Sequence, residues 1–194
     1  ERLRVEAERR MLAEAAELLA SSLDYTVTLE QTARLAVKDL CDVCGVIMRE
    51  SPERSPRVVA LIHRDPALAE RMRELARGFA AEAENPVLAQ VMRDGRSYLQ
   101  ETMTPEVMQA TIADPHQLEV TRDELKVQSS MAVALPGRER VLGVLVLLSC
   151  TPQRRFGPQD LSLAEELARR AALAVERAQL YAEAQEAVRS REEF

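Results

Sequence analysis

After Gly157-Pro158, the chain runs to Phe194 without another glycine or proline. Proline in the first turn followed by helix-favouring residues predicts one continuous helix over residues 158–194. At about 1.5 Å of rise per residue, such a helix spans roughly 55 Å. A compact body of about 150 residues is only some 35 to 40 Å across. The helix therefore has to extend beyond the body on which it packs.

This helix carries two apolar faces, of which a single sheet can cover only one. One face has the three-four spacing of a surface that packs against other helices. Its members are Ala164, Leu167, Ala171, Ala174, Ala178, Tyr181, Gln185 and Val188. A second seam repeats every seven residues, at Leu161, Ala168, Val175 and Ala182. A second helical surface is therefore expected.

Residues 1–23 supply that surface, because they also lack glycine and proline and predict a helix. Val5, Leu12 and Leu19 recur every seven residues, and Leu23 extends the seam. We expect the two helices to form a bundle across a two-fold axis in a parallel homodimer. The alternative is that they pack within one chain. The predicted dimer interface comprises Val5, Leu12, Leu19, Leu167, Ala171, Ala174, Ala178 and Tyr181.

The residues between the two helices predict an antiparallel sheet. Thr28 and Gln31 have capping-box spacing and predict a second helix that ends near Leu40. Runs rich in valine and isoleucine predict strands at 45–49, 57–63 and 141–148. Alternating small and apolar residues predict another strand at 129–135, and a short one is expected at 97–100. In the irregular segment 64–125, helices are expected from Pro66 to residue 77 and from Asn85-Pro86 to Arg93. This order predicts an α+β domain.

Composition excludes several function classes. The 26 basic and 32 acidic residues give a net charge of −6, which argues against a phosphate-driven contact with nucleic acid or anionic lipid. The longest apolar run, Val141 to Leu148, is too short to span a membrane. Three cysteines form neither an even disulfide set nor a four-ligand zinc site, so we expect a cytoplasmic protein. The absence of an initiating methionine indicates a fragment of a longer chain.

Three stretches resemble the GAF domains, small-molecule-sensing modules related in fold to PAS domains. They are Thr28 to Val37 leading into Cys44-Gly-Val-Ile-Met, the hairpin Leu135 to Leu147, and the closing helix Phe156 to Tyr181. The resemblance implies a central antiparallel sheet with long terminal helices on one face and a variable helical segment on the other. It also implies an amino-terminal signalling helix (1–23), a GAF domain (24–182) and the start of a helical linker (183–194).

The ending Ala184 to Phe194 resembles the linker into the dimerisation helix of bacterial sensor histidine kinases. We therefore expect a non-catalytic domain that binds a small ligand or relays a signal to a downstream kinase domain in the same chain. Two alternatives stay open: a degenerate GAF domain that only dimerises, and a GAF-fold thiol reductase of free methionine sulfoxide. No metal or cofactor is required by any residue pattern.

Candidate ligand chemistry follows from the family's known uses. The spaced motif for cyclic nucleotides is absent, and no cysteine lies between Cys44 and Cys150 to attach a bilin. His63 or His116 could ligate haem iron, although a structural or surface role is the simpler interpretation. Arginines at 64, 73, 77, 93 and 96 could bind an anion, and methionines at 72, 92, 103 and 108 could form an adaptable pocket wall.

Cys41 and Cys44 have redox-motif spacing but follow the carboxyl end of a helix, where the dipole does not stabilise a thiolate. We expect all three thiols to be inert. A ligand cavity is expected on the sheet face covered by residues 64–125, because this segment is the variable one. The candidate polar contacts in it are His63, Tyr98 and His116.

Overall fold

A single five-stranded sheet lies at the centre of the computed structural model, which describes residues 2–76 and 85–192. The strands follow the order β2-β1-β5-β4-β3, and every neighbouring pair is antiparallel. Their bounds are β1 Val43–Met48, β2 Arg57–His63, β3 Tyr98–Gln100, β4 Ser129–Pro136 and β5 Val141–Ser149. The predicted strands are all present, and the α+β class is confirmed.

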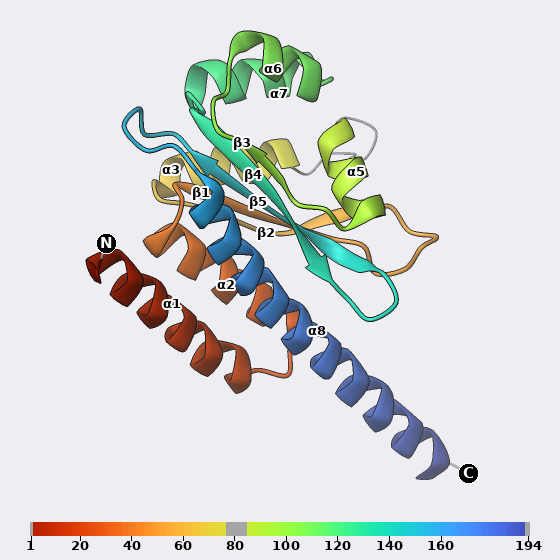
Figure 1. The fold of residues 1–194 in the computed structure, drawn as a ribbon. Helices are drawn as coiled ribbons and strands as arrows, with labels where there is room; N and C mark the ends of the chain where they lie inside the picture. Colours follow the sequence, from red (N-terminus) through yellow and green to blue (C-terminus); the bar gives the residue numbers. More distant parts are fainter. Residues whose placement is uncertain (1, 77–84, 193–194) are drawn as a thin grey trace.

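Helices cover the two faces of the sheet in the predicted division (Figure 1). On one face, α2 (Tyr25–Asp39) and α8 (Pro158–Glu192) pack on the strands, and α1 (Arg2–Ser21) packs on both helices as an outer layer. The other face is covered by the helical segment that follows β2 and precedes β4 in the sequence, apart from the short strand β3. Its elements are α3 Pro66–Ala76, α5 Pro86–Asp94, α6 Pro105–Thr111, α7 Pro115–Glu119 and a π-helical turn Val120–Glu124.

The start of α2 corrects the predicted capping box. The Asp24 carboxylate caps this helix and accepts hydrogen bonds from the backbone N–H groups of Thr26 (2.8 Å) and Val27 (3.4 Å). Thr28 lies inside the first turn, where its hydroxyl donates to the Asp24 carbonyl oxygen at 3.0 Å. Asp24 is the capping residue because it directly precedes the helix, where its carboxylate reaches the first backbone N–H groups that lack a partner within the helix.

The helices α1 and α8 run parallel in a constant register. The Arg170 guanidinium donates to the Leu12 carbonyl oxygen at 3.2 Å, and that of Arg177 donates to the Leu19 carbonyl oxygen at 2.8 Å. Both steps are seven residues long, so the two helices advance together, as the side-by-side ribbons in Figure 1 show. The terminal helices thus pack within one chain.

This packing corrects most of the predicted dimer interface. Leu19, Leu167, Ala171, Ala174 and Ala178 are buried in the chain's own core, because small alanine faces let the helices and sheet approach closely. Leu12 is half-buried. Only Val5 and Tyr181 of the predicted set are exposed, at 42% and 48%.

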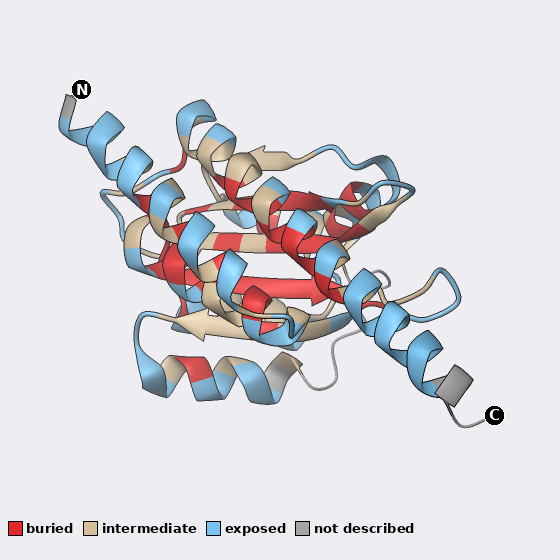
Figure 2. Ribbon diagram, turned by 90° about the horizontal axis from the view of Figure 1, so that it is seen from below, coloured by how far each residue is buried: buried red, intermediate tan, exposed pale blue. Residues whose placement is uncertain are grey.

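The carboxyl-terminal part of α8 leaves the body, as predicted from its length. Every residue from Tyr181 to Arg189 is exposed, and Figure 2 shows this end of the helix projecting past the sheet. The helix has no break near residue 182, where the resemblance placed a domain boundary. Within the described part of the chain, no helix combines the length and apolarity that a membrane crossing requires.

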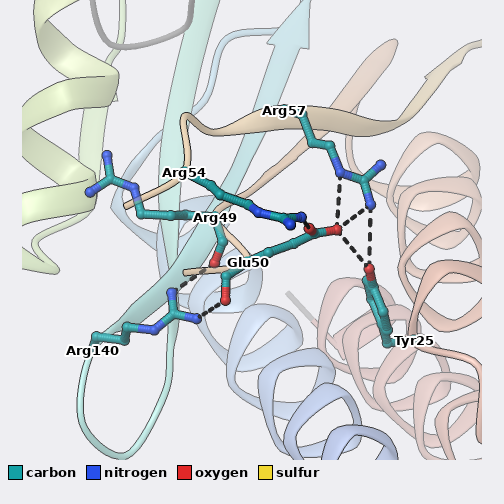
Figure 3. Close-up of polar contacts among 6 residues, drawn as sticks. All are labelled: Tyr25, Arg49, Glu50, Arg54, Arg57 and Arg140. Carbon is teal, nitrogen blue, oxygen red and sulfur yellow. Dashed lines mark hydrogen bonds and ion pairs between the residues drawn. The ribbon is translucent and has the colours of Figure 1, made fainter. Parts of the chain in front are cut away.

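A polar cluster around Glu50 fixes one end of the sheet (Figure 3). The Glu50 carboxylate accepts hydrogen bonds from Tyr25 on α2, Arg54 in the β1–β2 turn and Arg57 on β2. The hydrogen bond from Arg57 is the largest cause that lowers the pKa of Glu50. From the β4–β5 turn, Arg140 donates to the carbonyl oxygens of residues 49 and 50, both at 2.7 Å. The β1–β2 turn, the β4–β5 turn and the start of α2 are thereby tied together.

Candidate ligand-binding cavity

A cavity of about 210 Å³ lies between the sheet and the segment formed by α3, α5, α6 and α7. It lies on the face opposite α2 and α8, which confirms the predicted position. The alternation of strand residues explains the separation: Val43, Gly45 and Ile47 of β1 line the cavity. Cys44, Val46 and Met48 between them belong to the core under the terminal helices.

The floor of the cavity is one row of residues that crosses all five strands. Gly45 pairs with Leu61 of β2 on one side and with Val146 of β5 on the other. Val146 pairs in turn with Ala132 of β4, and Ala132 pairs with Tyr98 of β3. All five line the cavity. Because Gly45 and Ala132 in the inner part of this row are small, the floor is hollowed where a flat row of valines would fill it.

The covering segment supplies mainly aliphatic and thioether groups. Two of the four methionines expected in a pocket wall, Met72 and Met103, line the cavity, whereas Met92 and Met108 are buried in adjoining core clusters. The rest of the cover comes from short helices and their flanks: Ala76, Asn85, Val87, Leu88, Val107, Thr111, Ile112, Gln117, Val120, Thr121, Leu125 and Val127.

Three of the four hydroxyl groups on the described cavity lining, those of Tyr98, Thr111 and Ser130, donate within the protein. Tyr98 donates to Gln100 Oε1 at 2.6 Å, Thr111 donates to the Val107 carbonyl oxygen at 2.8 Å, and Ser130 makes a long contact of 3.6 Å with Met103 Sδ. The Asn85 side-chain oxygen caps α5, accepting from the N–H groups of Val87 and Leu88. Tyr98, Thr111 and Ser130 therefore present lone pairs to the cavity more than free hydrogens. Asn85 differs, because its oxygen is the atom that accepts and its amide NH2 group remains a donor.

Of the three predicted polar contacts, only Tyr98 lines the cavity. His63, at the end of β2, is half-buried and is not a lining residue, and its Nδ1 accepts from the Asp65 N–H at 2.7 Å. Its Nε2 is buried without a partner, and burial is the main cause that lowers the pKa of His63. His116 is exposed on α7, and the next residue, Gln117, lines the cavity instead. The spacing of Gln117, Val120 and Thr121 on one helical face was the signal that could have identified Gln117.

The described residues that line the cavity include no charged side chain and no histidine. The arginines proposed as anion ligands lie elsewhere: Arg64 donates to carbonyl oxygens of residues 37 and 41, Arg73 pairs with Glu70, Arg93 pairs with Asp94, and Arg96 is exposed. Arg77 lies outside the described residues. The described lining therefore offers no imidazole ligand for haem iron. The described residues also contain no cluster suited to a metal ion.

The three cysteines are unpaired and stand apart from the cavity lining. Cys41 and Cys44 are completely buried on the opposite side of the sheet. Burial is the largest cause that raises the pKa of Cys41 well above its usual range. Burial also raises the pKa of Cys150 to about 12. Neither thiol is activated at neutral pH.

Comparison with known proteins identifies the family to which this fold belongs. A family model described as GAF domain matches residues 27–175. No match is found among curated proteins. A solved GAF domain from an Acinetobacter phosphoenolpyruvate-protein phosphotransferase superposes with a TM-score of 0.65 and 16% identity, covering 93% of this chain and 96% of that one.

Two other solved structures are similar at the same level of identity. The free methionine-R-sulfoxide reductase from Neisseria meningitidis, in complex with its substrate, gives a TM-score of 0.64 and 16% identity over 90% of this chain and 91% of that one. The second GAF domain of DevS from Mycobacterium smegmatis gives 0.55 and 17% over 84% and 99%. Such likenesses show a shared fold.

Proposed function

Since the chain belongs to the GAF domain family, we propose that it is a non-catalytic sensory domain that binds a small molecule and relays its presence through the terminal helices. The observation that carries this proposal is the cavity on the sheet face opposite α2 and α8. A domain used only for dimerisation has no need of a hollowed sheet face, since close packing of that face would stabilise it further.

The sheet offers a direct path between ligand and helices. Neighbouring residues of β1 touch opposite layers, because Gly45 lines the cavity while Cys44 and Val46 pack in the core shared with α2 and α8. Because α2 packs on β1 and α8 packs on β4, a ligand that shifts β1 or β4 changes the surface on which one of these helices rests. Ligand binding would favour one of two arrangements of α8, as population shift requires.

The output of this relay is the projecting end of α8. We propose a cytoplasmic homodimer in which the exposed residues Leu173 and Leu180 of α8 meet their counterparts, with a histidine kinase domain following in the same parent chain. Leu173 and Leu180 are 65% and 55% exposed and stand seven residues apart on one helical face. The resemblance of residues 184–194 to a kinase linker supports the choice of output.

The reductase alternative has little chemical support in this chain. A thiol reductase of this fold needs a reactive thiolate beside its substrate, and the cavity lining contains no cysteine. The raised pKa values of Cys41 and Cys150 oppose thiolate formation as well. We expect no turnover of free methionine sulfoxide in a dithiol-coupled assay, and measurable turnover abolished by Cys150→Ser would overturn the non-catalytic assignment.

The sensory function is tested by screening a metabolite panel for thermal stabilisation and then measuring hydrogen exchange with the best binder. We expect slower exchange in α8 and α1, together with slower exchange in the strands of the cavity floor. The control is Ala132→Leu, which fills the floor and should abolish the stabilisation. A molecule that binds the cavity yet leaves exchange in α8 unchanged would contradict the relay. A panel without any binder would favour the domain that only dimerises.

A further inference from the structure

We propose that the cavity selects an uncharged, mainly hydrocarbon molecule about the size of one substituted ring, carrying at most one hydroxyl or N–H group. This inference rests on the proposed sensory function and specifies its ligand class. It follows from three properties of the described lining: its charge, the use of its hydroxyl hydrogens, and its volume.

Charge is the first argument. Of the 25 described residues that line the cavity, 19 are apolar or glycine and six are neutral polar residues. Several described ionic groups of the same segment pair with one another away from the lining: Arg71 lies near Glu74 and Glu124, and Arg122 pairs with Asp123. A charged ligand would lose its hydration without gaining a counter-ion, which is a large penalty. The cavity therefore favours a neutral ligand.

The hydroxyl groups sharpen this selection. Binding a carboxylate or phosphate requires hydrogen-bond donors, but Tyr98 and Thr111 already direct their hydrogens to protein oxygens. Ser130 directs its hydrogen toward a sulfur at 3.6 Å, a weak bond. Their oxygens keep lone pairs that can accept from a ligand. A single ligand hydroxyl or N–H group would be accommodated, whereas an anion would find only neutral donors and no cationic partner among the described lining residues.

Volume sets the size of the ligand. A dry apolar cavity of roughly 150 Å³ in a protein core holds a benzene molecule. The cavity here, at about 210 Å³, has room for a ring with a short substituent. The hollow over Gly45 and Ala132 places that ring against the sheet, flanked by Leu61 and Tyr98 at the two ends of the floor row. Larger macrocycles exceed this space.

The test uses three probes with one carbon skeleton and different charge: 2-phenylethanol, phenylacetate and phenethylammonium. Binding to the full 194-residue chain is followed by amide chemical shifts and by thermal unfolding. We expect saturable shifts at Gly45, Ala132 and Val146 with 2-phenylethanol. The melting temperature of the protein should rise by about 3 to 6 °C when the alcohol concentration is about ten times its dissociation constant. Affinity for each charged probe should be at least about tenfold lower.

Substitutions locate the site. Ala132→Leu should abolish the shifts at the floor, and Gly45→Ala should weaken binding several-fold without misfolding. An added Cβ at Gly45 meets the nearest Leu61 carbon at 3.5 Å, an ordinary contact. Ala16→Leu on the exposed face of α1 is the matched control and should bind as the unaltered chain does.

The outcomes separate this inference from the function on which it rests. Binding of phenylacetate or phenethylammonium at the floor as tightly as 2-phenylethanol would overturn the neutral ligand class and leave a sensory cavity. Failure of all three probes to shift the floor residues would count against both the ligand class and the cavity as a binding site. Selective binding of the alcohol that Ala132→Leu abolishes would support the proposal.

Discussion

The three thiols illustrate how position outweighs spacing at the level of single residues. Cys41 and Cys44 have the spacing of a redox pair, but the sheet and terminal helices enclose both side chains. The pair lies at the junction between the carboxyl end of α2 and β1, whereas the thiol pKa in reactive pairs is lowered by a helix amino terminus. Their spacing therefore reflects a helix-to-strand junction built from small apolar side chains.

We predict that native cysteines alkylate at least about tenfold more slowly than those of the unfolded chain at pH 8. The reason is burial, which also raises the pKa of Cys150 to about 12. Intact-mass analysis after iodoacetamide treatment, with and without guanidinium chloride, measures the difference. Rapid native labelling of any one cysteine would contradict it.

Asp42, immediately before β1, binds the loop that follows β5. The sequence alone did not indicate this role. Asp42 Oδ2 accepts from the N–H groups of Cys150 (2.8 Å) and Thr151 (3.2 Å) and from the Thr151 hydroxyl (3.2 Å). We predict that Asp42→Ala lowers the free energy of unfolding by about 2 to 4 kcal/mol, because backbone donors lose their acceptor. Asp42→Asn retains one oxygen and should cost less. Urea unfolding of both variants checks the order.

His63 gives the domain a pH-dependent stability. Its folded-state pKa is lowered by burial, so the unfolded chain binds more protons than the folded chain between that pKa and the ordinary value of about 6.5. The free energy of unfolding should therefore fall as the pH decreases from 7.5 to 5.5. His63→Asn keeps an acceptor for the Asp65 N–H and should reduce this fall. His116→Asn, at an exposed position, is the control, and an equal reduction there would refute the assignment.

At the level of elements, the sequence predicted those helices and strands that depend on interactions between residues close together in the chain. Strands β2 and β5 follow from their valine-rich runs, and α5 follows from Asn85, whose side chain caps the helix as expected. The floor of the cavity did not follow, because the alignment of Gly45, Val146, Ala132 and Tyr98 depends on the register of strands far apart in the sequence. His116 was predicted as a contact from its residue type, but the position at which α7 begins places the next residue, Gln117, at the cavity.

The register between α1 and α8 carries an element-level prediction. Arg170 and Arg177 donate to carbonyl oxygens of α1 one heptad apart, and each bond contributes about 1 kcal/mol. Replacing both by alanine should accelerate hydrogen exchange in α1 at least about tenfold, while exchange in the central strands stays unchanged. Arg169→Ala is the matched control, because Arg169 is exposed and pairs only with Glu166 among the contacts of this helix. Equal exchange in α1 for both variants would refute the role of this register.

At the scale of the whole molecule, intrachain packing changes which surface remains for a second copy. Ala178 was a predicted interface residue, but its burial means that a charge there would unfold the domain instead of separating a dimer. Among the described residues of α8, the exposed large apolar side chains are Leu173, Leu180, Tyr181 and Val188. Two copies that meet along Leu173 and Leu180 would place both projecting helices side by side, in the arrangement that a two-fold signalling domain needs.

We therefore predict that the chain forms a dimer of about 43 kDa, twice 21.7 kDa, at tens of micromolar. Leu173→Glu with Leu180→Glu should convert it to a monomer, because like charges would face each other across the axis and the apolar contact would be lost. Both side chains are exposed, so the melting temperature of the monomeric body should change little. Gln159→Glu, exposed near the start of α8, should remain dimeric. Light scattering measures the mass of each variant in solution. If the unaltered chain is a monomer, both the proposed dimer and the relay that depends on it are wrong.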